Sequence, residues 1–110
     1  MLSIRQAQAT DFTRILDINA TEEEKTSRID LARIAQLHRW ADYHRVAVVD
    51  DEIIGFLLVM GEASDYDGDN FRWFVERYDR FLYVDRIVID QSYAGRGVGS
   101  ALYGDLIEFA

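Results

Sequence analysis

The 110-residue chain is predicted to fold as one α/β domain, and three features predict it. Two stretches repeat apolar residues at the helical period, a hairpin pattern of two apolar strands follows, and a strand, a glycine loop and a helix end the sequence. With 49% hydrophobic residues the chain has enough apolar surface for one core and too little length for two. We therefore expect a single domain over residues 1–110.

The first third of the sequence predicts a short strand and two helices. Residues 3–6 read as a strand, and Thr10 or Asp11 is a suitable cap for the helix that follows. A second helix is expected to begin near Ser27 or Asp30. The helical period is carried by Phe12, Ile15 and Leu16 in the first helix, and by Leu31, Ile34, Ala35, Leu37 and Ala41 in the second.

A hairpin is predicted in the middle of the chain. His44 to Val49 and Ile53 to Met60 are apolar strands, and Asp50-Asp51-Glu52 between them reads as a tight turn. We expect this hairpin to be central and mostly buried. Residues 61–70 are polar and acidic and predict an exposed loop, which leads into a short aromatic helix over residues 71–78.

A further strand is predicted from Phe81 to Ile89. Simple alternation places Tyr83, Asp85 and Ile87 on the same side of this strand. The same rule places Leu82, Val84, Arg86 and Val88 on the other side.

Three glycines, at positions 95, 97 and 99, mark the junction between this strand and a helical pattern that begins near Val98 and runs to Ala110. Glycines let the backbone approach a ligand closely, and the unpaired amides of a helix's first turn carry partial positive charge. Such a loop binds anions, and Arg96 adds a forked donor suited to phosphate oxygens. The spacing fits neither a Walker A loop, which needs a lysine, nor the dinucleotide-binding fingerprint.

The segment Ala94-Gly95-Arg96-Gly97-Val98-Gly99 resembles the acetyl-CoA signature of the GNAT superfamily of N-acetyltransferases, written Arg/Gln-x-x-Gly-x-Gly/Ala. The family places this signature directly after its fourth strand, as here. The resemblance implies a mixed, largely antiparallel twisted sheet flanked by helices. Members of the family continue with a fifth strand and further elements, so the resemblance covers the first part of the family's domain.

The resemblance also implies a binding mode for acetyl-CoA as cosubstrate. The backbone of Ile87, Val88 and Ile89 would pair with the pantetheine arm, while the diphosphate would lie on the glycine loop. Because Ala94 replaces the Arg or Gln of the signature, that contact is left to Arg96 and to the amides from Gly95 to Ser100. This set consists of Gly95, Arg96, Gly97, Val98, Gly99 and Ser100.

Acetyl transfer to an amine needs a group that removes a proton from the nucleophile. Asp85 is our first candidate for this catalytic role, and Tyr83, which aligns with a catalytic position of some family members, is the second. Both have structural alternatives: Asp85 could form an ion pair with an arginine such as Arg80, and Tyr83 could be an aromatic core residue.

The function expected from the resemblance is transfer of an acetyl group from acetyl-CoA to a primary amine of a small molecule or peptide. The alternative is a coenzyme A-binding or self-associating module without activity, or an inactive fragment of an acetyltransferase. Ala94 and the shortened domain favour this alternative. A free sheet edge would also permit a homo-oligomer.

Composition narrows the partners and the compartment. Twenty acidic and twelve basic residues give a net charge of −8, which disfavours nucleic acid and anionic membrane surfaces as partners. The chain has no cysteine and its start lacks an apolar signal sequence, so we expect a cytoplasmic protein.

The acidic loop has three interpretations. Asp65, Asp67, Asp69 and Glu76 have the spacing of a calcium loop, but Asn70 replaces its required glycine. The carboxylates could instead attract a cationic amine beside nearby aromatic residues, or the loop could simply be solvated. The aromatic residues are Trp73, Phe74 and Tyr78.

The two histidines, His38 and His44, lack a third ligand at metal spacing, so no metal site is expected. Trp40 and Trp73 are expected to be core or interface residues.

Overall fold

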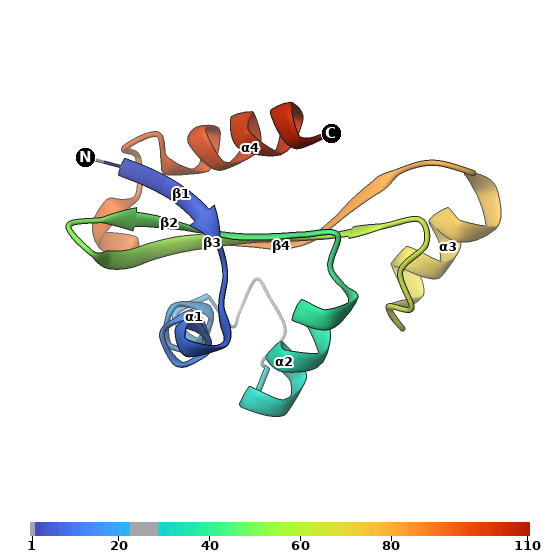
Figure 1. Cartoon of the computed structure of the whole chain (residues 1–110), viewed down its shortest axis with the longest axis horizontal. Helices are drawn as coiled ribbons and strands as arrows, with labels where there is room; N and C mark the ends of the chain where they lie inside the picture. Colours follow the sequence, from blue (N-terminus) through green and yellow to red (C-terminus); the bar gives the residue numbers. More distant parts are fainter. Residues whose placement is uncertain (1, 23–28) are drawn as a thin grey trace.

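The computed structural model describes residues 2–22 and 29–110. Four strands form one antiparallel sheet in the order β1-β2-β3-β4, so β1 and β4 are its two edges (Figure 1). The strands are β1 Leu2–Gln6, β2 Tyr43–Val49, β3 Glu52–Gly61 and β4 Leu82–Ile89. The predicted α/β fold with a largely antiparallel sheet is confirmed.

Helices cover both faces of the sheet. α1 and α2 lie on one face, α4 lies on the other, and α3 lies beyond one end of the sheet (Figure 1). Their bounds are α1 Phe12–Ala20, α2 Leu31–Trp40, α3 Asp69–Arg77 and α4 Val98–Phe109, with short 3-10 turns η1 Ala9–Asp11 and η2 Gln91–Tyr93. Within the described residues no helix is both long and apolar enough to cross a membrane.

Strand β3 is the centre of the core, with every residue from Ile53 to Gly61 buried. It reads as a continuous apolar run because helices cover it on both sides. Phe56 packs with residues of α1 and α2 on one face, while Leu57 packs with Leu102 of α4 on the other. The predicted central, buried hairpin is confirmed.

The hairpin turn between β2 and β3 uses two aspartates in the left-handed region. Asp50 and Asp51 have φ values of 51° and 64°. Positive φ at both central residues is the geometry of the tight hairpin turn whose twist matches that of the strands. The predicted turn is therefore confirmed.

Both predicted helix starts are confirmed in position, with Asp11 as the N-cap residue of α1 and Asp30 as that of α2, but only Asp30 caps its helix with its side chain. Asp30 caps α2 by accepting a hydrogen bond from the amide of Arg33, whereas Ser27 lies outside the described residues. Asp11 does not cap α1 with its side chain. Its carboxylate instead accepts hydrogen bonds from the amide of Gln8 and the guanidinium of Arg5, at 2.8 and 2.7 Å.

A bulge in β4 changes the predicted faces of this strand. Leu58 pairs with Arg86 and Val59 pairs with Val84, so Asp85 between them has no partner on β3. One extra residue in a strand reverses the alternation beyond it. Tyr83 therefore packs toward α2 and α3 and Ile87 toward α4, and the prediction that they share a face was wrong.

Candidate functional site

The loop between β4 and α4 has a backbone that glycine makes possible. Gly95 and Gly97 have φ values of 77° and 80°, in the left-handed region that residues with a Cβ rarely adopt. A Cβ at either position would meet no atom within 4 Å, so conformation and not crowding requires glycine there. At the loop's start, the carboxylate of Asp90 accepts a hydrogen bond from the amide of Ser92 at 3.0 Å.

The first turn of α4 presents backbone amides. Gly97 is the N-cap residue and no side chain caps the helix there. Within the helix the first bond runs from the amide of Ala101 to the carbonyl of Gly97, at 3.0 Å. The amides of Val98, Gly99 and Ser100 precede this bond and have no acceptor within the helix. Together with the helix dipole they form a site for an anion.

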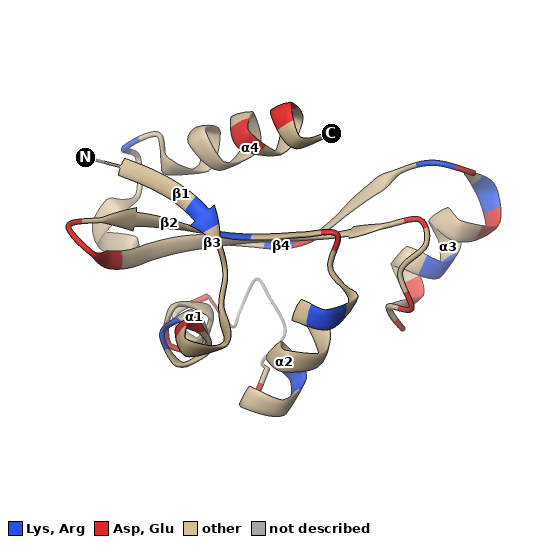
Figure 2. Ribbon diagram, in the orientation of Figure 1, with Lys and Arg blue, Asp and Glu red and all other residues tan. Residues whose placement is uncertain are grey.

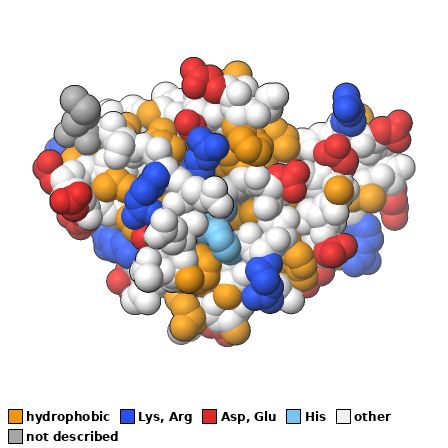
Figure 3. Space-filling view, viewed as in Figure 1, with side chains coloured by type: hydrophobic (Ala, Val, Ile, Leu, Met, Phe, Trp, Pro, Cys, Tyr) orange, Lys and Arg blue, Asp and Glu red, His pale blue; other side chains and the backbone are white. Residues whose placement is uncertain are grey.

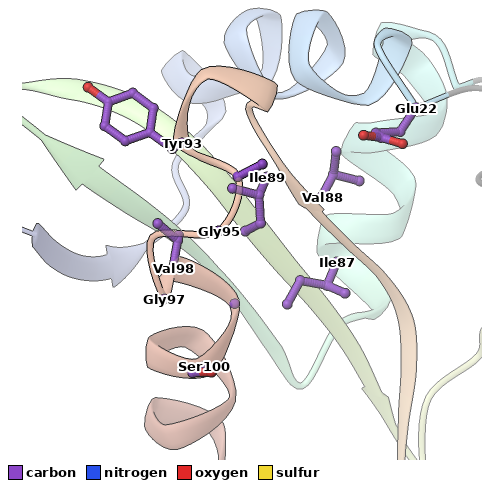
Figure 4. Close-up of a pocket in the computed structure, with 11 residues that line it drawn as sticks. Glu22, Ile87, Val88, Ile89, Tyr93, Gly95, Gly97, Val98 and Ser100 are labelled. Carbon is purple, nitrogen blue, oxygen red and sulfur yellow. The ribbon is translucent and has the colours of Figure 1, made fainter.

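A pocket of about 430 Å³ joins these amides to the edge strand β4 (Figure 4). It is lined by Glu22, Ile87, Val88, Ile89, Tyr93, Ala94, Gly95, Gly97, Val98, Gly99 and Ser100. The structure thus brings together all of the predicted cofactor-binding residues except Arg96. The guanidinium of Arg96 lies over the ring of Tyr93, 5.3 Å from its centroid.

Two lining residues were not predicted. Glu22 follows the C-terminal end of α1, and no sequence signal connects it with the glycine loop. Tyr93 could have been included, because it stands directly before the signature, in η2.

Asp85, the extra residue of the bulge in β4, lies in a buried polar network and does not line this pocket. Its side chain is 4% exposed, and its carboxylate accepts hydrogen bonds from the hydroxyl of Tyr66 and from Nε of Arg86, the latter at 2.9 Å. Arg86 in turn donates to Oδ1 of Asn19 in α1, at 3.1 Å. Burial, and then the hydrogen bond to Asp85, raises the pKa of Tyr66 above its usual value. The structure therefore gives Asp85 an ion pair with Arg86 and not with Arg80.

Tyr83 belongs to an aromatic cluster at the same end of β4. Its ring centroid lies 5.8 Å from those of Phe71 and Phe74 and 6.2 Å from that of Tyr66. This placement matches the alternative of an aromatic core residue. Neither Tyr83 nor Asp85 lines the pocket, and a catalytic role for either one stays a prediction.

The acidic loop is partly held by ion pairs. Both carboxylate oxygens of Asp67 accept hydrogen bonds from Arg33, at 2.7 and 3.2 Å, and the pKa of Asp67 is lowered by this contact. Because both carboxylate oxygens of Asp67 are engaged by Arg33, one of the four carboxylates with calcium-loop spacing is already occupied. Trp73 is 45% exposed and carries the guanidinium of Arg77 over its ring, 4.2 Å from the centroid. A substrate-attracting role for this region stays a prediction.

The two histidines meet each other between α2 and β2. Nδ1 of His38 lies 2.7 Å from Nδ1 of His44, whose ring is buried beside Phe12 and Phe56. Burial, followed by the nearby His38, lowers the pKa of His44 to about 3. Over residues 2–22 and 29–110, no group of three or more His, Cys, Asp or Glu side chains could hold a metal ion.

Comparison with known proteins identifies the family. A sequence model of the acetyltransferase (GNAT) family matches residues 2–110. The chain belongs to the GNAT acetyltransferase family. The match extends over both the glycine loop and the strands before it, so the resemblance predicted from the loop holds for the whole GNAT chain described here. A comparison with curated protein sequences found no match.

Solved structures of acetyltransferases share the fold. Ard1 from Thermoplasma volcanium is 24% identical, with a TM-score of 0.72 over 98% of this chain and 62% of that one. A possible acetyltransferase from Clostridium difficile 630 is 19% identical, with a TM-score of 0.70 over 99% and 70%. The aminoglycoside antibiotic 6'-N-acetyltransferase from Acinetobacter baumannii is 14% identical, with a TM-score of 0.73 over 100% and 71%. This GNAT chain therefore spans roughly two thirds of the length of each structure, and at these identities the likeness establishes the fold.

Proposed function

We propose that this GNAT protein binds acetyl-CoA in the pocket beside β4 and transfers the acetyl group to a primary amine. The observation that carries the proposal is the pocket itself. It places the open edge of β4 next to helix amides that have no acceptor within α4. An extended ligand with a diphosphate at one end and a peptide-like arm matches these two surfaces.

The residues present fit such a ligand. The amides of Val98, Gly99 and Ser100 would hold the diphosphate, and Arg96, whose guanidinium lies over the ring of the lining residue Tyr93, would add charge. The outer side of β4 pairs with no other strand among the described residues, so the backbone of Ile87 and Ile89 is available to the pantetheine arm. Acetyl-CoA would supply the activated acetyl group.

Asp85 and Tyr83 remain the proposed proton acceptors, in that order. Asp85 already accepts hydrogen bonds on both carboxylate oxygens, so it would have to exchange Tyr66 or Arg86 for an incoming amine. This occupation is a specific observation in favour of the second candidate function, a coenzyme A-binding module without turnover. Association of two copies through the β4 edge also stays a proposal.

Two measurements on the same protein test the proposal. Isothermal titration with acetyl-CoA is expected to give saturable binding, and Arg96→Ala is expected to weaken it about tenfold, or about 1.4 kcal/mol, through loss of a charge-assisted contact. Arg80→Ala, an exposed arginine in the turn before β4, is the matched control and is expected to bind as the unmodified protein does.

Release of the coenzyme A thiol in the presence of a panel of primary amines then separates the two candidate functions. Thiol release that depends on an amine supports the transferase. Binding without release supports the binding module, and the lack of any acetyl-CoA binding would contradict both.

A further inference from the structure

The segment that leads from β4 into the glycine loop is held by the side chain of Asp90. Its carboxylate accepts hydrogen bonds from the amide and the hydroxyl of Ser92, at 3.0 and 2.6 Å, and from the guanidinium of Arg14 in α1, at 2.8 Å. The amide of Asp90 donates to the carbonyl of Ile54 in β3, at 2.8 Å. Asp90 therefore joins the start of the loop to both the sheet and α1.

The guanidinium of Arg14 is itself oriented by the sheet. Its Nε donates to the backbone carbonyl of Ile53 at 3.0 Å, and one terminal nitrogen donates to Glu52 at 3.2 Å as well as to Asp90. A guanidinium is planar and rigid, so a bond through one nitrogen sets the direction in which the others point. Because Ile53 belongs to the buried strand β3, Arg14 fixes the carboxylate of Asp90 relative to the core.

The loop beyond Asp90 depends on this anchored start. In Figure 4 the chain passes Tyr93 and turns at Gly95 and Gly97 before α4 begins. Among the described residues, the side-chain hydrogen bonds that tie residues 90–97 to another element are those between Asp90 and Arg14. Glycine loses more conformational freedom on ordering than any other residue. A loop with two glycines therefore stays in one conformation only if its ends are held.

We propose that Arg14 is a positioning residue for the coenzyme pocket: through Asp90 it holds η2 and the glycine loop in the conformation that receives the diphosphate. The inference rests on the proposed function, because acetyl-CoA is the ligand whose affinity the positioning would change. Arg14 does not line the pocket, so its effect passes through Asp90 and not through contact with the ligand. A loop that is ordered before the ligand arrives lowers the conformational cost of binding.

Isothermal titration of two single variants with acetyl-CoA tests the proposal. Arg14→Gln removes the cation, and Asp90→Asn removes the anion but keeps an oxygen that can accept the bond from the amide of Ser92. Each variant is expected to bind acetyl-CoA about fivefold more weakly. Charge alone predicts opposite results, because an anionic ligand is attracted less after loss of a cation and more after loss of an anion. Weaker binding in both variants therefore supports positioning.

Three further variants show whether the two residues act through one contact. The double variant of Arg14→Gln and Asp90→Asn is expected to bind as weakly as either single variant, because the contact is already lost in each. Arg14→Lys keeps the charge without the fork and is expected to recover part of the affinity. Arg5→Gln breaks another arginine–aspartate pair, the one with Asp11, and is the matched control with unchanged affinity.

Amide hydrogen exchange of the ligand-free protein measures the order of the loop directly. The amide of Ser92 donates to the side chain of Asp90, and the amides of Tyr93 and Arg96 donate to carbonyls within the segment. In Arg14→Gln these three amides are expected to exchange at least about fivefold faster, while those of β3 keep their rates. An equal acceleration in β3 would overturn the inference, since the contact would then stabilise the fold as a whole.

The titrations distinguish failure of this inference from failure of the proposed function. Absence of acetyl-CoA binding by the unmodified protein would contradict the proposed function and overturn the positioning role with it. If the unmodified protein binds, affinities within about twofold of it in Arg14→Gln and Asp90→Asn would overturn the positioning role while the coenzyme site stands. Tighter binding by Asp90→Asn would also overturn it, because that result follows from charge alone.

Discussion

The two ends of strand β4 have opposite designs. At the C-terminal end, beside the glycine loop, backbone amides and glycines form an open pocket wall. At the N-terminal end, side chains fill the space: an aromatic cluster surrounds Tyr83, and Asp85 and Arg86 form a buried ion pair with side chains 4% and 6% exposed. The fold therefore leaves backbone groups open at the end of β4 where we propose that acetyl-CoA binds, and packs interlocking side chains, which stabilise the fold, at the other end.

The acidic side chains are not confined to either end of β4. Acidic side chains occur on the β2–β3 turn, on α4 and around α3 (Figure 2). On the face shown in Figure 3, charged side chains of both signs are scattered among hydrophobic ones. The net charge of −8 therefore describes the surface as a whole, and the partial positive charge at the N-terminus of α4 is a local feature of the pocket.

The largest expected effect comes from breaking the packed end. Asp85→Asn leaves Arg86 buried without its carboxylate, and removal of one partner of a buried pair costs about 3 kcal/mol or more. Urea unfolding is expected to show this loss. Asp67→Asn, which removes the exposed partner of Arg33, is the control and is expected to cost less than about 1 kcal/mol. Equal losses in the two variants would contradict the comparison.

Asp85→Asn also tests whether the packed end of β4 affects ligand binding at the open end. Acetyl-CoA affinity of the folded variant is expected to equal that of the unmodified protein, because Asp85 does not line the pocket. A variant that stays fully stable yet loses turnover would instead support the catalytic role of Asp85.

Acid is expected to lower the stability of the fold through the histidine pair, His38 and His44, between α2 and β2. Burial lowers the pKa of His44 to about 3 and also lowers that of His38, so the unfolded chain takes up these protons first as the pH falls below 6.5, the usual pKa of histidine. The free energy of unfolding therefore decreases as pH falls from about 6.5 toward 3, with a slope approaching about 1.4 kcal/mol per pH unit for each proton.

Urea unfolding between pH 4.5 and 6.5 measures this slope. This pH range lies above the range in which Asp11 and Asp90 take up protons. The pKa values of these carboxylates are lowered by Arg5 and by Ser92 respectively. His44→Phe places another aromatic ring beside Phe12 and Phe56 and is expected to remove most of the slope. A slope that persists in this variant would show that other groups titrate.

The smallest expected effect concerns the open end alone. Gly99 and Gly104 both lie in α4, neither has positive φ, and a Cβ at either meets no atom within 4 Å. Alanine at each is expected to stabilise the helix by about 0.5–1 kcal/mol. Gly99 lines the pocket and Gly104 does not, so only Gly99→Ala is expected to weaken acetyl-CoA binding, about tenfold or about 1.4 kcal/mol. Equal affinities in the two variants, measured by isothermal titration, would contradict the placement of the diphosphate.

Much of the fold and part of the site follow from local sequence. The turn at Asp50 and Asp51, the cap at Asp30 and the strand-loop-helix unit around Gly95 and Gly97 depend on neighbouring residues, and the structure has each of them as predicted. The pocket residues Gly95, Gly97, Val98, Gly99 and Ser100 belong to this group because the backbone of the loop and of the first turn of α4 forms that wall. Local conformational preferences are readable from sequence since they involve few residues at a time.

Contacts between distant segments were decided by the tertiary structure alone. The extra residue at Asp85 depends on how β4 registers against β3, and it moved Ile87 to the face opposite Tyr83. Glu22 lies at the pocket because α1 packs against the same strand. The carboxylate of Asp11 binds Arg5 and Gln8 and does not cap α1. Register and packing minimise the free energy of the whole chain, so no periodicity within one segment can specify them.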